Sequence, residues 1–375
     1  MRTVNTITAI PYVHFAGRQW YVFKLLGIVG YILGVSEASL FGYMMGLSVS
    51  VIALLAVLAI VFFLVTTKIK EWLWHDAGLV YYQQHIVLIG GIWFVLYILD
   101  LPVYAYLDAV ALGLGSCLAA GRIGCAMAGC CHGRPARWGI YYRPTGVYSG
   151  IPLAYKGVPV FPVQLIESFG VLVILGIAVV LRLKSESDGV LFFCFSGAYN
   201  GLRFVLEFRR GDVDRLFFTG LSRAQWTAIG LSWLLLIPIL ELAEWLVVSH
   251  LIITLLISIW GCAVLGAAVN DQIAQTLILP DHLVEVVEIA RYHQINQVHR
   301  TSKGLHLSVY KASTAPYGVT VTLSGITGKS PRRVMDKLAR TVFSSYGIRW
   351  NRLDVRHPRK QIYQYSTLFD SKPKY

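Results

Sequence analysis

Long apolar stretches restrict the fold of this chain more than any other feature of its sequence. Of its 375 residues, 56% are hydrophobic and only 14% are charged, a balance typical of integral membrane proteins. A helix needs about 20 mostly apolar residues to cross a bilayer. The apolar runs predict about eight spanning helices, over Trp20–Val35, Leu40–Thr66, Leu79–Leu99, Leu101–Ala120, Val163–Leu181, Val190–Phe208, Ala224–Leu240 and Leu251–Val269.

The segment after these runs has a different pattern. Two stretches have the apolar spacing of helices, and two alternate apolar and polar residues as strands do. They are Asp281–Arg291 and Ser330–Phe343 for the helices, and Gly304–Lys311 and Gly318–Ser324 for the strands. The expected fold class is an all-α polytopic membrane protein of about seven or eight transmembrane helices, with a small C-terminal α+β soluble domain. The expected units are a membrane domain (residues 1–248), an additional transmembrane helix (249–272) and a basic extramembrane domain (281–375).

The excess of positive charge favours anionic partners. The formal net charge is +13, and the nearest anions to a membrane protein are lipid phosphates. We therefore expect an anionic phospholipid as a partner, and no nucleic acid. Basic residues of the C-terminal domain form either a solvated face or a surface that contacts lipid headgroups. They include Arg332, Arg333, Arg349, Arg352, Arg356, Arg359 and Lys360.

A polar stripe runs along the predicted helix Val190–Phe208 and just beyond it. At about 100° per residue, four side chains share one helix face: Tyr199, Arg203, Glu207 and Arg210. Ionisable residues in spans are rare and usually face a cavity or the bundle interior. An Arg203–Glu207 pair that only neutralises itself is the simpler interpretation, but it leaves the tyrosine and the second arginine unexplained. We expect a functional face.

A second candidate region is Ala119–Arg134, where an apolar run ends in charged, thiol and glycine residues. Arg122 follows a stretch that is apolar enough to lie in lipid, where an unpaired charge costs several kcal/mol, so we expect an anion to meet it. Gly121 and Gly124 are among the glycines that leave the backbone free to turn and to approach a ligand. The segment is more typical of a lined pocket than of a spanning helix.

Two other predicted helices begin with candidate functional residues. His85 near the start of one could accept a proton near neutrality, although an interfacial role is the common one for such a histidine. Gln164 and Glu167 share a face of another, directly after Pro162. They fit ordinary helix-start chemistry as well as they fit a functional role.

Three cysteines lie close together in the sequence, at Cys125, Cys130 and Cys131, with His132 directly after them. Adjacent cysteines are poorly placed to close a tetrahedral zinc site together, and the chain has no second C-x2-C pair, so we expect no metal. Three interpretations stay open. The residues form a disulfide from Cys125 to one of the other two, they include a reactive thiol beside Arg122 and His132, or they are small packing residues.

Taken in chain order, four segments resemble the prolipoprotein diacylglyceryl transferase family, whose members move a diacylglyceryl group from phosphatidylglycerol onto a lipobox cysteine. His85-Ile-Val-Leu-Ile-Gly90 is similar to the family's H-G-G-L-I-G and keeps its histidine. Gly121-Arg122-Ile123-Gly124 resembles the family's G-R-I-G, and Phe161-Pro162-Val163-Gln164-Leu165-Ile166-Glu167 resembles H-P-x-Q-L-Y-E. The closest of the four is Tyr199-x3-Arg203-Phe204-x2-Glu207-Phe208-x-Arg210, which is similar to Y-x3-R-F-x2-E-F-x-R.

Departures from the family pattern concentrate after the G-R-I-G segment. Where the family has two asparagines and a glutamate, this chain has Cys125, Ala128 and Cys130. The changes remove polar and acidic groups that are expected to orient the substrate. The additional span and the basic C-terminal domain also lie outside the family pattern. The resemblance therefore implies a divergent branch whose acceptor is open.

The resemblance implies a transferase in the bacterial plasma (inner) membrane that works without a cofactor. It would move a diacylglyceryl group from phosphatidylglycerol to an acceptor thiol, a prolipoprotein lipobox cysteine or a related acceptor, and release glycerol phosphate. Arg122 and Arg203 would stabilise charge that develops on the phosphate. His85, or Tyr199 in second place, would take the proton of the thiol. The expected substrate-binding residues are Gly121, Gly124, Arg134, Gln164, Glu167, Glu207 and Arg210.

The competing interpretation is not an enzyme. It is a catalytically inactive membrane protein that binds anionic lipid or a protein partner through the pocket and the basic C-terminal domain. A transporter is less favoured, because the sequence has no internal repeat and no paired broken helices.

Overall fold

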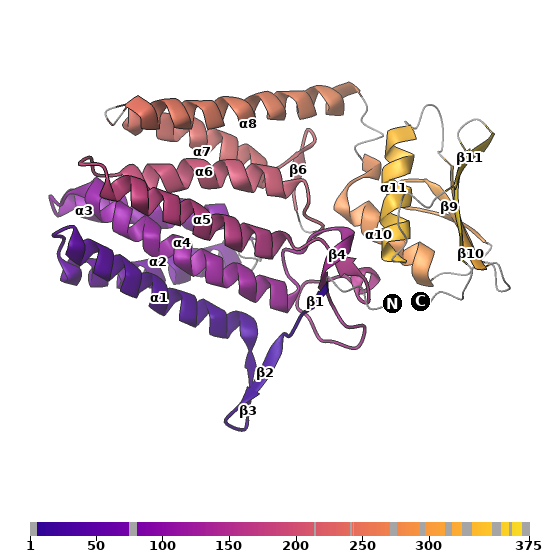
Figure 1. The fold of residues 1–375 in the computed structure, drawn as a ribbon, viewed down its shortest axis with the longest axis horizontal. Helices are drawn as coiled ribbons and strands as arrows, with labels where there is room; N and C mark the ends of the chain where they lie inside the picture. The colour runs from indigo at the N-terminus through magenta and orange to yellow at the C-terminus, as the bar shows by residue number, and fades with distance from the viewer. Residues whose placement is uncertain are drawn as a thin grey trace.

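The computed structural model describes most of the chain as a helical bundle followed by a region that contains a β-sheet (Figure 1). The described residues are 6–74, 81–213, 215–240, 242, 244–270, 276–292, 297–311, 317–324, 332–346, 354–359 and 362–369. The bundle helices are α1 (Val22–Met44), α2 (Val49–Trp74), α3 (Tyr81–Ile98), α4 (Val103–Ala128), α5 (Val163–Leu183), α6 (Val190–Glu207), α7 (Arg223–Ile239) and α8 (Glu244–Asn270). Each predicted span thus falls on a helix.

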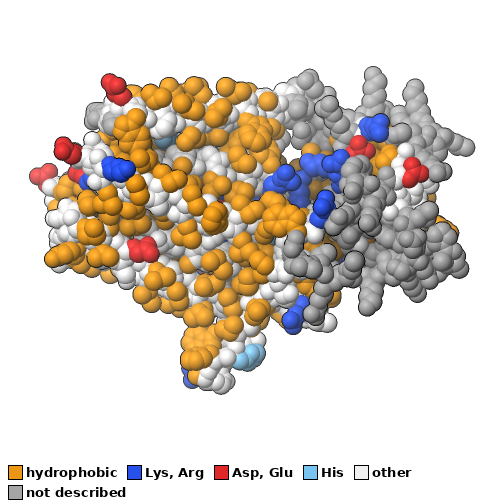
Figure 2. All heavy atoms as spheres, viewed as in Figure 1, with side chains coloured by type: hydrophobic (Ala, Val, Ile, Leu, Met, Phe, Trp, Pro, Cys, Tyr) orange, Lys and Arg blue, Asp and Glu red, His pale blue; other side chains and the backbone are white. Residues whose placement is uncertain are grey.

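Five of these helices are long and apolar enough to cross a membrane. They are Val22–Met44, Val49–Ile69, Val103–Ala128, Val163–Leu183 and Glu244–Gly266, and Tyr82–Ile98 is a shorter apolar helix. Figure 2 shows hydrophobic side chains spread over the visible surface of the bundle. An apolar surface of this extent is stable in lipid. The chain is therefore a multi-pass membrane protein.

Helix α4 lies at the centre of the bundle and packs closely on α1 through small residues. A Cβ atom on Gly34 would lie 2.3 Å from the backbone oxygen of Gly113, and one on Gly124 would lie 3.1 Å from the Cα atom of Phe23. Glycines at such positions let two membrane helices approach backbone to backbone. The expectation that Ala119–Arg134 is a pocket segment and not part of a spanning helix is therefore wrong for its first part, because α4 continues to Ala128.

The helix ends at Gly129, whose φ of 90° is accessible to glycine and costly for other residues. Gly121 and Gly124 lie inside the helix, so they do not turn the chain.

Short strands form a cap at one end of the bundle. Strand β4 (Pro135–Tyr141) pairs with β1 (Thr6–Thr8) in parallel and with β5 (Pro159–Val160) in antiparallel orientation. Further hairpins are made by β2 (Tyr12–Phe15) with β3 (Arg18–Tyr21), and by β6 (Phe217–Phe218) with β7 (Leu221–Ser222). The 3-10 turn η1 (Leu153–Tyr155) lies between β4 and β5.

The C-terminal region is an α+β unit with its own core. Its helices α10 (Pro280–Tyr292) and α11 (Arg332–Ser345) and its strands β9 (His306–Lys311) and β10 (Tyr317–Ser324) confirm the four predicted elements within a few residues. Strands β8 (Val298–Arg300), β11 (Asp354–Arg359) and β12 (Ile362–Phe369) complete an antiparallel sheet in the order β11-β12-β10-β9-β8. Leu283, Val321 and Leu338 are fully buried in its core. Of the predicted basic residues, Arg349, Arg352 and Lys360 lie outside the described residues, the backbone alone is described at Arg333, Arg356 and Arg359, and Arg332 is exposed.

Helix α10 fixes the C-terminal region to the cap. Arg291 Nη1 donates to the backbone oxygens of Ala154, at 2.7 Å, and of Lys156, at 2.8 Å. Val287 is fully buried in one apolar cluster with cap residues that include Tyr155 and Val160. The region therefore packs against the end of the bundle where the cap lies.

A buried histidine makes the stability of this region depend on pH. His282 Nδ1 lies 2.8 Å from the Leu277 oxygen and Nε2 lies 2.8 Å from Thr301 Oγ1. Burial lowers the pKa of His282 in the folded protein below its ordinary value of about 6.5. The folded state disfavours the protonated imidazole of His282. The contribution of the neutral imidazole to the free energy of unfolding is therefore fully present above about pH 6.5, and it is lost as the pH falls toward the pKa of His282 in the folded protein.

We expect amide hydrogen exchange in α10 and β9 to speed up when the pH falls from 7.5 to 5.5, after correction for intrinsic rates. His282→Gln is expected to weaken this pH dependence and to destabilise the region by about 1–3 kcal/mol, because a buried partner is lost. His306→Gln, on β9, is the matched control. An unchanged pH dependence in His282→Gln would contradict the assignment.

Candidate active site

Buried charged residues meet at the cap end of the bundle, on three different helices. Arg122 lies in the last turns of α4, and Glu167 lies in the second turn of α5. Arg122 Nε is 3.1 Å from Glu167 Oε2, and both side chains are at most 6% exposed. An arginine and a carboxylate so deeply buried are stable only as partners.

Glu167 also binds the polar face of α6. The Tyr199 hydroxyl donates to Glu167 Oε1 at 2.8 Å, and Arg203 Nε lies 3.9 Å from the same oxygen. Glu167 therefore connects the two arginines that the sequence analysis selected. Arg122 and Arg203, the two residues expected to bind the phosphate, thus lie on either side of one carboxylate.

Glu207, one turn beyond Arg203, is the second carboxylate of the cluster. Its oxygens lie 2.6 Å from Arg203 Nη1, 2.9 Å from Arg215 Nη1 and 3.7 Å from Arg210 Nη1. Asp212 binds the far side of Arg210, with Oδ2 at 2.7 Å from Nη2. Three arginines around one carboxylate are more than neutralisation needs, so the interpretation of Arg203–Glu207 as a simple pair does not describe this cluster.

The cluster carries an excess of positive charge and unused donors. Among the described residues, four guanidinium groups meet three carboxylates: Arg122, Arg203, Arg210 and Arg215 against Glu167, Glu207 and Asp212. Arg122 Nε, Arg203 Nε and Arg203 Nη1 are buried and have no hydrogen-bond partner there. The ion pairs of Arg122 and Arg203 are thus close in distance but not aligned as hydrogen bonds, whereas Arg210 and Arg215 donate to Asp212 and Glu207. A phosphate would satisfy such donors and balance the charge.

Gln164 and Arg134 connect the cluster to the turn after α4. Gln164 is fully buried, and its Nε2 donates to the Cys130 oxygen at 2.9 Å. Arg134 Nε donates to the Arg210 oxygen at 3.0 Å. Burial and the neighbouring Arg215 and Arg209 lower the pKa of Arg134 to about 10. Arg134 therefore adds positive charge beside the cluster.

The C-terminal region contributes a further cation near this place. Burial, with Arg134 and Arg209 nearby, lowers the pKa of Lys337 on α11 to about 8. In Figure 2 Lys and Arg side chains gather where the bundle meets the C-terminal region. This junction attracts anions.

His85 lies on helix α3, whose Tyr82 packs against Tyr199. Tyr82, one turn earlier on α3, has its ring centroid 6.5 Å from that of Tyr199 and donates from its hydroxyl to Asn200 Oδ1 at 3.1 Å. His85 is three residues along the same helix and is half-buried. The predicted base thus lies on the helix end that packs against Tyr199.

All six cysteines are free thiols in the structure. The sulfurs of Cys125, Cys130 and Cys131 nevertheless lie within 4.8 Å of one another. Hydrogen bonds from Cys125 and Cys130, aided by Arg210 and Arg122, hold the pKa of Cys131 well below its ordinary value. The reactive-thiol interpretation therefore has support at Cys131.

Arg215 and Asp212 were missed by the sequence reasoning, although both bind the predicted arginine and glutamate side chains. They follow the end of α6 in a charged loop, where helical periodicity no longer determines which side chains meet. By contrast, Gly124 was predicted to approach a ligand but packs against α1. A Cβ atom on Gly121 would contact nothing within 4 Å.

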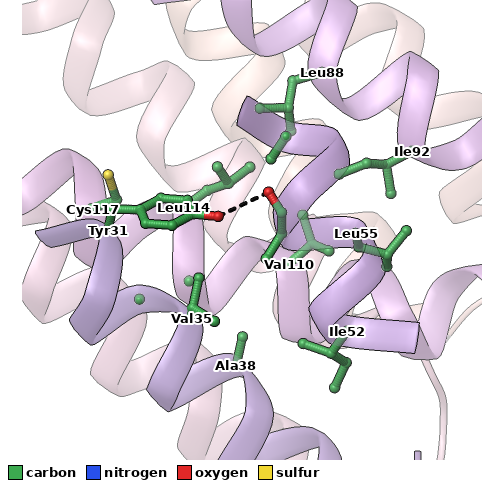
Figure 3. Close-up of a pocket in the computed structure, with 14 residues that line it drawn as sticks. Tyr31, Val35, Ala38, Ile52, Leu55, Leu88, Ile92, Val110, Leu114 and Cys117 are labelled. Atoms are coloured by element: carbon green, nitrogen blue, oxygen red, sulfur yellow. Dashed lines mark hydrogen bonds between the residues drawn. The ribbon is translucent and has the colours of Figure 1, made fainter. Parts of the chain in front are cut away.

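An apolar pocket of about 70 Å³ lies elsewhere, among α1 to α4 (Figure 3). Leu55, Leu88 and Val110 line it, and the Tyr31 hydroxyl at its edge donates to the Ala56 oxygen at 2.9 Å. Its lining has no charged side chain. The pocket is apolar, whereas the buried charged residues lie in the arginine cluster.

Fold and site together define a class: a multi-pass helical membrane protein with a buried arginine and carboxylate site suited to an anionic group. Comparison with known proteins gives the family. Residues 20–242, more than half of the chain, match the family described as prolipoprotein diacylglyceryl transferase. The chain belongs to this family. The match ends before α8 and the C-terminal region, as the resemblance implied.

Two curated relatives illustrate the similarity. A phosphatidylglycerol–prolipoprotein diacylglyceryl transferase of Clostridium tetani is 34% identical over 121 residues, which are 32% of this chain and 43% of that protein. A protein of the same name from Dehalococcoides mccartyi is 32% identical over 119 residues, 32% of this chain and 44% of that protein. The matched part spans less than half the length of these relatives.

Proposed function

We propose that this protein transfers the diacylglyceryl group of phosphatidylglycerol to the thiol of a prolipoprotein cysteine and releases glycerol phosphate. The family supports this activity, since the relatives are named for it. The observation that carries the proposal is the convergence of Arg122 and Arg203 on Glu167, with buried guanidinium N–H groups that have no hydrogen-bond partner among the described residues.

In the proposed reaction the acceptor sulfur attacks a glyceryl carbon. A carbon–sulfur bond forms, the carbon–oxygen bond to the phosphate breaks, and its electron pair leaves with glycerol phosphate. Negative charge grows on the phosphate oxygens in the transition state. Arg122 and Arg203 are fixed by Glu167 before the reaction, so they stabilise this charge without reorganising.

The thiol must lose its proton to become a nucleophile. We assign this proton to His85 in the first place, on the half-buried α3 face next to the tyrosines. Tyr199 is the second candidate. Because its hydroxyl donates to Glu167, Tyr199 accepts a proton only if it passes its own to that carboxylate.

The remaining predicted residues act as positioning and headgroup-binding groups in this proposal. Glu207 holds Arg203 and Arg210, and Gln164 holds the turn at Cys130. Arg134 and Arg210 lie toward the cap, where a glycerol headgroup reaches the aqueous interface. Gly121 keeps space open beside Arg122.

The membrane arrangement completes the proposal. We infer seven or eight transmembrane helices in a bacterial plasma (inner) membrane, with α3, α6 and α7 crossing beside the five longer apolar helices. The basic C-terminal region then lies on the membrane side where the cap lies, close to anionic headgroups.

The test is a transfer assay with purified full-length protein in lipid. Phosphatidylglycerol labelled in its headgroup glycerol and a lipobox peptide are the substrates. We expect release of labelled glycerol phosphate together with a peptide that carries a diacylglyceryl thioether. The matched control replaces the peptide cysteine by serine. Binding of phosphatidylglycerol without release of label would contradict a transferase.

One observation favours a second candidate, a catalytically inactive protein that binds anionic lipid. Cys125, Ala128 and Cys130 occupy the positions where the family motif has two asparagines and a glutamate. The same assay separates the candidates, because the inactive protein binds phosphatidylglycerol and leaves both substrates unchanged.

A further inference from the structure

Three cysteine sulfurs form a compact triangle at the edge of the arginine cluster. The sulfurs of Cys125, Cys130 and Cys131 all lie within 4.8 Å of one another. Three sulfurs that share a tetrahedral zinc ion at about 2.3 Å are about 3.8 Å apart. Side-chain shifts of about an ångström or less therefore suffice to coordinate one ion.

The backbone explains how two adjacent cysteines face the same point. In an extended chain, neighbouring side chains point to opposite faces. Here Gly129 ends α4 with a φ of 90°, and Cys131 has a φ of 53°. A residue with a side chain adopts this left-handed conformation at an energetic cost. The left-handed backbone at Cys131 turns its side chain toward that of Cys130. Two adjacent cysteines can therefore coordinate one ion here.

The surroundings of the triangle compensate negative charge. Arg122 and Arg210 interact electrostatically with Cys131. A zinc ion with three thiolates carries one net negative charge, which these guanidinium groups offset. Cys125 is buried, and the other two cysteines are half-buried.

His132 follows the triangle directly but lies outside its donor set. Its Nδ1 lies 2.8 Å from the Gly133 oxygen, while Nε2 is buried with no hydrogen-bond partner among the described residues. Metal-binding histidines often hold one ring nitrogen on a backbone carbonyl in this way. Among the described residues, however, the donor atoms close enough to share one ion are the three sulfurs.

We propose that Cys125, Cys130 and Cys131 bind a zinc ion whose fourth coordination position receives the acceptor thiol. Catalytic zinc sites have three protein ligands and one open position, and a thiol that coordinates zinc is deprotonated. This inference rests on the transferase function proposed above. It explains why cysteines occupy family positions that otherwise carry polar groups.

The step balances as follows. The acceptor thiol binds zinc and gives its proton to the base, His85 or solvent. The zinc-bound sulfur attacks the glyceryl carbon, the carbon–oxygen bond breaks, and glycerol phosphate leaves with the electron pair. The product is a neutral thioether, a weaker zinc ligand than a thiolate, so the lipidated acceptor dissociates and zinc stays.

Metal binding is tested first, without any activity readout. Purified full-length protein is reconstituted with Zn²⁺ against a competing chelator, and Co²⁺ serves as the spectroscopic probe. We expect one ion per chain and sulfur-to-cobalt charge-transfer absorption. Cys131→Ser and Cys130→Ser are expected to weaken binding at least about 100-fold, more than loss of an outer-shell partner does. Cys117→Ser, on α4 together with Cys125, is the matched control and is expected to bind like the wild type.

Addition of a lipobox peptide is expected to shift the Co²⁺ spectrum, whereas the serine peptide leaves it unchanged. Circular dichroism and size-exclusion profiles confirm that each variant is folded. Binding that persists in Cys130→Ser and Cys131→Ser, or a peptide that leaves the spectrum unchanged, overturns the proposal.

Activity then separates this inference from the proposed function. We expect transfer to fall when zinc is removed and to return when zinc is restored. Unchanged transfer in the zinc-free protein overturns the zinc role and leaves the transferase intact. Stoichiometric zinc and a peptide-dependent spectrum without transfer in the wild type support the site and overturn the transferase.

Discussion

Replacing Arg203 by lysine is expected to lower diacylglyceryl transfer at least about 100-fold, because loss of one preorganised donor to a developing charge typically costs that much. The guanidinium lies between two carboxylates, with Nη1 2.6 Å from Glu207 and Nε 3.9 Å from Glu167. Lysine keeps the charge that these carboxylates need, but it lacks the planar fork that binds a phosphate through two N–H groups. We therefore expect normal accumulation in membranes together with lost turnover.

Arg122→Lys is expected to behave in the same way, since Arg122 contacts the other oxygen of Glu167. Alanine at either position is expected to abolish turnover. The measurement is the initial rate of glycerol phosphate release in proteoliposomes, per amount of folded protein. Arg182→Lys is the matched control, because Arg182 is also buried and ion-paired but lies about 20 residues before Arg203 on another helix. Transfer within threefold of wild type in Arg203→Lys or Arg122→Lys would remove the proposed catalytic role.

The polar face of α6 could be predicted from sequence because helical period alone determines which side chains share a face. Tyr199, Arg203 and Glu207 lie where that period puts them, and all three are buried. The need for an anionic partner of Arg122 could be predicted from the cost of burying an unpaired charge. A buried arginine at position 122 requires an anion, and the structure supplies it at Glu167.

The extent of α4 could not be predicted, because glycines have two opposite structural uses. The glycines of Ala119–Arg134 are expected to turn the chain, but Gly124 lets α1 approach, so the helix continues to Ala128. Of the glycines in Ala119–Arg134, only Gly129 adopts the left-handed conformation that a turn requires. A single sequence does not distinguish these uses, since the choice depends on what packs against the residue.

The strands of the cap were missed for a different reason. β1, β5, β6 and β7 have at most three residues each, too short for an alternating pattern to be recognised. Their pairing is set by contacts between distant segments, such as Thr6 with Gly139.

A carboxylate within an apolar run indicates a buried ion pair more strongly than these short strands indicate a sheet, and it was not recognised either. Asp108 lies inside the predicted span Leu101–Ala120 and is fully buried.

Asp108→Ala is expected to destabilise the bundle by about 3–5 kcal/mol, the usual cost of leaving a buried ion-pair partner alone. Asp108 Oδ2 accepts from Arg182 Nε at 2.8 Å and from the Gly189 N–H at 2.9 Å, and Oδ1 accepts from the Phe192 N–H at 2.8 Å. Helix α6 begins after Gly189, which has no side chain to cap it. The carboxylate of α4 therefore caps α6 from outside and also binds the arginine of α5.

The effect of Asp108→Ala on function should differ from that of the arginine variants, because position 108 is about 21 Å from Arg122 along α4. We expect a lower thermal midpoint in detergent and less protein in membranes, with near wild-type turnover in the fraction that remains folded. Asp188→Ala removes the half-exposed partner of Arg182 and should cost only about 1 kcal/mol or less. Equal destabilisation by the two variants would contradict the capping role. A large loss of turnover in folded Asp108→Ala protein would show that the two ion clusters communicate through α6, whose two ends they hold.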